Sequence, residues 1–154
     1  GRVVPREIVM TRAREIIDLT GLSRPVRSLR ELVGLGEGLT PSGDDFIGGL
    51  LFAQWHLHKT YPDATTWDQR AVDELIDYAR TRTNVISHAI LRDHTDGQSV
   101  EPMHNLIFAL LRGESLDQIL PHVSGLLSIG NTSGREMLAG LISGIISSRD
   151  GQSP

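Results

Sequence analysis

Apolar residues recur at intervals of three and four along most of the chain, which is the spacing of a helix with one buried face. This spacing predicts helices over residues 5–19, 43–59, 66–79, 83–93, 100–111 and 134–147. Another helix is expected to begin at Ser115 and to be kinked or restarted at Pro121, and residues 23–33 repeat the same spacing. No clear run of four or more residues alternates as a strand would. The pattern predicts an all-α fold, a compact orthogonal bundle of about seven helices.

Two of these helices are expected to lie buried at the centre. The segment 43–59 is apolar in nearly every direction, which is typical of a helix inside a bundle. Gly48 and Gly49 lower helix propensity, so we expect a neighbouring helix to approach closely there. The start of the last helix, TSGREMLAGLI over 132–142, repeats the pattern of PSGDDFIGGLL over 41–51. Either two buried helices converged on one pattern, or two equivalent helix N-termini point into one cleft.

A glycine-rich loop, GLGEGLTPSG over 34–43, precedes the first of these two starts. Its glycines allow positive φ angles and close approach of the backbone to another group. Ser42 followed by Asp45 fits a capping box, and Ser133 followed by Glu136 fits another. Thr66 with Gln69 fits a third, ahead of the helix over 66–79. A helix N-terminus carries free N–H groups and partial positive charge, so it can hold an anion.

Length, charge and composition limit the classes of function that the chain can have. A chain of 154 residues is expected to form a single helical domain over residues 1–154, although the start at Gly1 leaves open that it is the C-terminal part of a longer protein. A net charge of -4, without a basic cluster interleaved with aromatics, argues against nucleic acid. Neither a membrane-length apolar run nor a signal peptide is present, and cysteine is absent. We therefore expect a cytoplasmic protein that binds neither nucleic acid nor membrane.

Three segments resemble, in order, the C-terminal region of a bacterial family long labelled a domain of unknown function. They are GLGEGLTPSGDDFIGGLL, TRTNVISHAILRDHTDGQSVEPMHNLIFALLRG and GNTSGREMLAGLISG, and the resemblance covers about residues 29–146. The family includes a subunit of the oxamate carbamoyltransferase of allantoin catabolism, and full-length members are longer than this chain. The resemblance implies a transferase of several subunits that moves a carbamoyl group between carbamoyl phosphate and oxamate. It assigns no catalytic residue.

The substrates that the resemblance implies are small anions, and the two serine–glycine helix starts are the candidate site for them. The backbone N–H groups and hydroxyls of the glycine loop would form one wall, and the loop before the last helix would form the other. The candidate substrate-binding residues on these walls are Gly36, Gly38, Thr40, Ser42, Gly43, Asn131, Thr132, Ser133, Gly134 and Arg135. Arg135 is the best placed cation by sequence, and a solvent-exposed role for it is at least as consistent with the pattern.

A polar stretch over residues 83–88 forms a second candidate group. Asn84, Ser87 and His88 lie three and four residues apart, so they share one helical face. Asn84 and Ser87 are further candidate substrate ligands. His88 is a candidate catalytic acid or base, and its alternative is a histidine with a structural hydrogen bond.

The adjacent Asp44 and Asp45 leave three functions open. We expect Asp45 to cap its helix and Asp44, a candidate catalytic residue, to point at the site or at a partner. In the leading hypothesis the chain is a subunit of, or an enzyme related to, oxamate carbamoyltransferase. In the second, both aspartates bind magnesium in a hydrolase; the composition allows this metal without requiring it. In the third, the chain is a non-catalytic partner-binding subunit.

Overall fold

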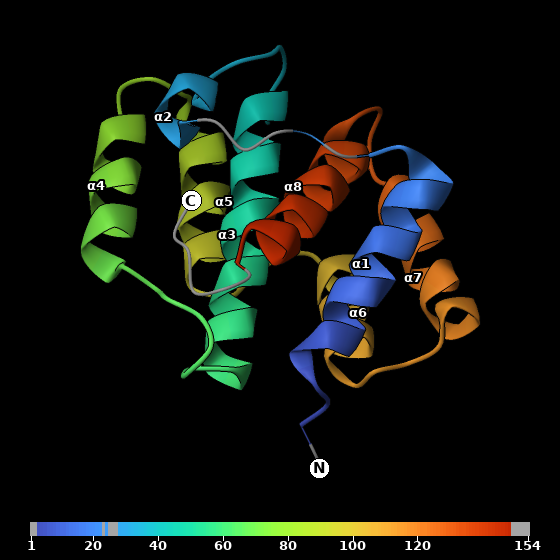
Figure 1. Ribbon diagram of the computed structural model, residues 1–154. Helices are drawn as coiled ribbons and strands as arrows, with labels where there is room; N and C mark the ends of the chain where they lie inside the picture. The colour runs from blue at the N-terminus through green and yellow to red at the C-terminus, as the bar shows by residue number, and fades with distance from the viewer. Residues whose placement is uncertain (1–2, 23, 25–27, 149–154) are drawn as a thin grey trace.

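The computed structural model describes residues 3–22, 24 and 28–148. This part of the chain is all-helical, as predicted, and has no strand (Figure 1). Its helices are α1 (Arg6–Thr20), α2 (Leu29–Leu32), α3 (Ser42–Thr60), α4 (Gln69–Ala79), α5 (Val85–Thr95), α6 (Glu101–Leu111), α7 (Leu116–Leu127) and α8 (Ser133–Ser147). The eight helices are close to the predicted number of about seven.

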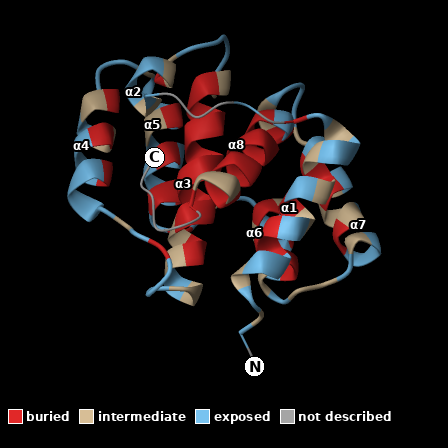
Figure 2. Ribbon diagram, viewed as in Figure 1, coloured by how far each residue is buried: buried red, intermediate tan, exposed pale blue. Residues whose placement is uncertain are grey.

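Helices α3 and α8 form the centre of the molecule, as the apolar pattern predicted (Figure 2). Their backbones touch because glycines face the partner helix. A Cβ atom at Gly49 would lie 2.3 Å from the carbonyl oxygen of Met137, and one at Gly140 would lie 2.1 Å from that of Phe46. Any larger residue at these two positions would force the helices apart.

The other helices pack on this central pair from two sides (Figure 1). Helix α5 packs on α3 and is in turn covered by α4, with the short α2 across their ends. On the other side, α1 and α7 pack on α8, and α6 packs on α7. No helix in the described ranges is long and apolar enough to cross a membrane.

The two central helices begin in the same way, and neither start is the predicted capping box. Pro41 is the N-cap of α3 and Thr132 is that of α8, with no side-chain cap hydrogen bond at either. The N–H of Asp45 bonds to the carbonyl of Pro41, so Ser42 is the first residue inside the helix. Pro41 already has the extended ψ of a cap residue, 144°, and its carbonyl accepts the first helical bond.

Three further expectations about helix ends need correction. Asp68 caps α4 by accepting a hydrogen bond from the N–H of Ala71, so the predicted capping box of Thr66 with Gln69 is wrong. Helix α7 starts with a capping box at Ser115 and continues through Pro121, so the expected restart there is wrong, whereas the alternative of a kink stays a prediction. Residues 23 and 25–27 of the helix predicted over 23–33 lie outside the described residues. Of its described residues, Leu29–Leu32 alone are helical.

Candidate functional site

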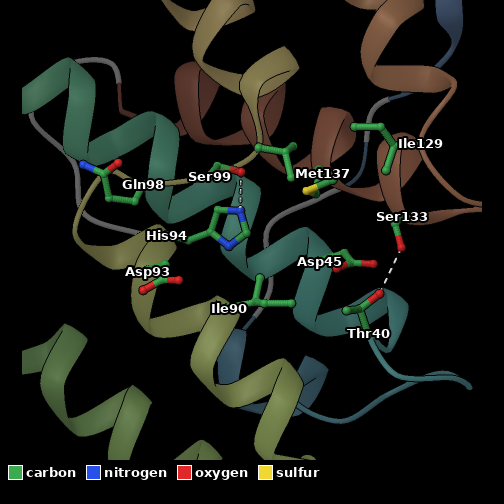
Figure 3. Close-up of a pocket in the computed structure, with 11 residues that line it drawn as sticks. Thr40, Asp45, Ile90, Asp93, His94, Gln98, Ser99, Ile129, Ser133 and Met137 are labelled. Carbon is green, nitrogen blue, oxygen red and sulfur yellow. Dashed lines mark hydrogen bonds between the residues drawn. The ribbon is translucent and has the colours of Figure 1, made fainter.

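A cavity of about 340 Å³ lies beside the first turns of α3 and α8 (Figure 3). The last turn of α5 and the segment after it form its other wall. Its lining residues are Thr40, Asp45, Ile90, Asp93, His94, Gln98, Ser99, Val100, Ile129, Ser133 and Met137. The cavity therefore collects polar side chains from segments that are far apart in the sequence.

The glycine loop brings Thr40 to the start of α8. Gly34, Gly36 and Gly38 all have positive φ, as the loop composition predicted. At Gly36, φ is 110° and a Cβ atom would lie 2.7 Å from the hydroxyl oxygen of Ser42, so the tight fold of the loop requires glycine there. The hydroxyl oxygens of Thr40 and Ser133 are 2.9 Å apart and hydrogen-bonded (Figure 3). This bond ties the two helix starts together at the edge of the cavity.

Asp45 is the ionisable group at this meeting point. Its residue is only 4% exposed, and its carboxylate oxygen Oδ2 is buried without a hydrogen-bond partner. Burial raises the pKa of Asp45 from its usual 3.8 to about 6, and the nearby charges of Asp44 and Glu136 add to the rise. The hydroxyls of Ser133 and Thr40 lie beside the carboxyl group and partly oppose this effect on the pKa. A carboxyl group that titrates near neutral pH can accept or donate a proton in a site.

His94 and Ser99 form the opposite wall. The Nε2 atom of His94 is 2.8 Å from the hydroxyl oxygen of Ser99 (Figure 3). Burial lowers the pKa of His94 to about 4, so its ring is neutral at neutral pH. The ring lies against α3 at Gly48, where a Cβ atom would come within 2.5 Å of Nδ1. This contact explains one of the two consecutive glycines in α3.

Asp44 holds the surrounding segments together. Its carboxylate accepts hydrogen bonds from the N–H of Gly34 at 2.8 Å, and from the hydroxyls of Thr83 at 2.5 Å and Ser87 at 2.6 Å. It is directed at these donors and does not line the cavity. The expectation that Asp45 caps the helix is wrong, because α3 has no side-chain cap and Asp45 lines the cavity. A catalytic role for Asp44 stays a prediction.

The polar stretch over 83–88 supports the site from outside the cavity. Asn84 caps α5 by accepting from the N–H of Ser87, and its side-chain NH₂ donates to the carbonyl of Leu39. The Nε2 atom of His88 is 2.9 Å from the carbonyl oxygen of Ile76. None of the three predicted residues of this stretch is among those that line the cavity.

Among the predicted residues, Thr40, Asp45 and Ser133 line the cavity. Arg135, Asn131 and Thr132 are exposed and do not line it. The wall of the cavity that includes His94 and Ser99 was not predicted from the sequence. The available signal was the polar stretch DHTDGQS over 93–99, which begins where the helix predicted over 83–93 ends. In the structure α5 continues to Thr95 and buries His94.

The described lining residues include two carboxylates, Asp45 and Asp93, and neither arginine nor lysine. Within the described ranges, no group of three histidine, cysteine, aspartate or glutamate residues is placed to hold a metal ion. Magnesium binding by Asp44 and Asp45 therefore stays a prediction from the sequence.

Comparison with known proteins identifies the family. A family model described as oxamate carbamoyltransferase subunit AllH matches residues 32–145, which is most of the chain. The match includes α3, all but the last two residues of α8, and the whole cavity lining. No solved structure matches the chain. Because the members of this family are described as a subunit of oxamate carbamoyltransferase, that enzyme contains other subunits as well. The chain therefore belongs to the family of the oxamate carbamoyltransferase subunit AllH.

Proposed function

We propose that this chain is a component of a carbamoyltransferase that binds a small anionic substrate, oxamate or carbamoyl phosphate, in the cavity at the starts of α3 and α8. The observation that carries the proposal is the hydrogen bond between Thr40 and Ser133, which joins the two helix starts at the cavity. The positive ends of two helix dipoles then act on one small space. In that bond one hydroxyl donates to the other, so the pair keeps one hydroxyl hydrogen that can donate to a ligand oxygen.

The backbone offers fewer donors than the sequence suggested. The N–H groups of Gly43 and Gly134 already bond to the carbonyls of Leu35 and Ile129, and that of Asp45 bonds to Pro41. Hydroxyls and helix dipoles would therefore supply most of the attraction within this chain. Because the described lining lacks a basic side chain, we expect another subunit to add positive charge at the cavity mouth.

The proposal is tested by removing both hydroxyls in the full-length protein with Thr40→Val and Ser133→Ala. Ser128→Ala is the matched control, because Ser128 is exposed and its hydroxyl donates to the carbonyl of Gly125 near the end of α7, away from the cavity. Calorimetry with oxamate and with carbamoyl phosphate should show about tenfold weaker binding for the double variant, since a net hydrogen bond contributes about 0.5–1.5 kcal/mol. The control should bind as the wild type does.

Two outcomes would contradict the proposal. One is wild-type affinity in the double variant, and the other is the absence of binding to the wild type when its partner subunits are present. Full activity of the assembled enzyme with the double variant would favour the alternative of a non-catalytic, partner-binding subunit.

A further inference from the structure

Helices α3 and α8 are related by a local two-fold arrangement. Gly49 packs on Met137 while Gly140 packs on Phe46, and each residue is 91 positions from its counterpart. The loops before the helices differ by three residues in length, but they make matching backbone hydrogen bonds. The N–H of Leu35 bonds to Leu32 at 3.1 Å, and the N–H of Ile129 bonds to Leu126 at the same distance.

This relation makes Asp45 the counterpart of Glu136, since both stand four residues into their helices. Both are buried carboxylates, at 4% exposure each. The two carboxylates differ in the groups that contact them. Glu136 forms an ion pair with the guanidinium group of Arg24, which also lies over the ring of Phe46, 5.8 Å from its centre. On the side of Asp45, the residue equivalent to Phe46 is Met137. The position equivalent to that of Arg24 is occupied by the cavity.

The Oδ2 atom of Asp45 is thus an acceptor without a donor. In the described part of the chain, two buried side-chain atoms lack a hydrogen-bond partner, Asp45 Oδ2 and His94 Nδ1. Both residues line this cavity, but the Nδ1 atom of His94 lies against the backbone of Gly48. The carboxyl group of Asp45 points to the side of the cavity where Thr40 and Ser133 meet (Figure 3). A buried acceptor left unpaired carries a cost that a bound donor would remove.

We propose that the carboxylate of Asp45 accepts a hydrogen bond from the NH₂ group of the substrate's carbamoyl or amide end, in the position that Arg24 occupies beside Glu136. This inference rests on the proposed function. Oxamate and carbamoyl phosphate share an H₂N–C=O group and differ in the anionic group attached to it. One acceptor for the shared NH₂ group therefore fits both ligands, while the hydroxyl hydrogen that the Thr40–Ser133 bond leaves free faces their oxygens. Asp45 is then a residue that orients the ligand and selects amides over plain carboxylates.

Oxalate tests this selection, because it replaces the amide of oxamate with a second carboxylate. The full-length protein should bind oxamate at least about tenfold more tightly than oxalate, since the NH₂ group bonds to a charged acceptor whereas oxalate meets it with like charge. Asp45→Asn should reduce this ratio to about one, because its NH₂ group can donate to a carboxylate. Asp93→Asn removes an equal charge from the exposed wall of the same cavity and should leave most of the preference.

The inference fails if oxalate binds the wild type as tightly as oxamate, or if Asp45→Asn keeps the wild-type ratio. In either case the proposed function survives as long as oxamate binding still depends on Thr40 and Ser133. If neither ligand binds the assembled protein, both proposals fall. A competition with guanidinium ion, at a concentration equal to that of oxamate and too low to denature the protein, gives a further test. If guanidinium displaced oxamate, the inference would be overturned, because the natural donor to Asp45 would then be a cation such as a partner's arginine.

Discussion

Replacing Asp45 by asparagine should stabilise the folded protein at neutral pH, because it removes a buried charge whose Oδ2 atom lacks a hydrogen-bond partner. Burial raises the pKa of Asp45 from 3.8 to about 6, a change of about two units. At about 1.36 kcal/mol per unit, ionisation of this group would cost the native state about 3 kcal/mol. The carboxyl group borders an open cavity where water screens part of the charge, so we expect about half, roughly 1.5 kcal/mol.

The sign of this effect depends on pH. The native state holds the proton of Asp45 more tightly than the unfolded state, so the wild type loses stability as pH rises from about 4 to about 6. Asp45→Asn does not titrate in this range. The difference in free energy of unfolding between variant and wild type should therefore be near zero below about pH 4 and complete above about pH 6.

Urea unfolding of both proteins at pH values from 4.5 to 8 measures this difference directly. At pH 7.5 the variant should also melt about 3–6 °C higher than the wild type, given the usual entropy of unfolding for a domain of this size. Asp93→Asn is the control, and because Asp93 is exposed its effect should stay within about 0.5 kcal/mol. A destabilised Asp45→Asn variant, or a gain that does not change with pH, would refute the reasoning, since either result means that the carboxylate has an adequate partner.

Three other expectations follow from the packing around the cavity. Gly140→Ala should lower the free energy of unfolding, measured with denaturant, by about 3 kcal/mol or more, because its methyl group would lie 2.1 Å from the carbonyl oxygen of Phe46. In the same assay, Gly125→Ala should raise the free energy of unfolding by about 0.5–1 kcal/mol, because its methyl group meets nothing within 4 Å. Asp44→Ala should cost about 3–4 kcal/mol, because it removes the acceptor of three hydrogen bonds; a loss under 1 kcal/mol in urea unfolding would speak against this role. The ring of His94 should titrate near pH 4 by NMR, and a value above 6 would show that the ring is not desolvated.

The fold was largely predictable because burial leaves a direct record in the sequence. Helix α3 is apolar on all sides and α8 repeats its pattern, so both could be placed at the centre before any coordinates were known. Helix starts were less predictable. Ser42 and Pro41 each fit a cap position, and a one-residue difference in the helix start decides which of them takes it.

The site was only partly predictable, because its chemistry depends on contacts between distant segments. Asp44 and Asp45 are the same residue type at neighbouring positions, and only the donors on Thr83 and Ser87 show which one is internally bonded. The burial of His94 likewise depends on Gly48 in another helix. The polar stretch over 93–99 marks this segment in the sequence, but it does not show that His94 is buried.

The most direct test of the account is a titration of the ¹⁵N-labelled full-length protein with oxamate, followed by NMR. If the substrate binds where α3 and α8 begin, the largest amide shifts should fall on residues 40–45, 94–99 and 129–137. Amides at the second cavity, which is lined by Trp67 and Leu75, should stay unchanged. Shifts that cluster around Trp67, or none at all at saturating oxamate in the presence of the partner subunits, would contradict the account.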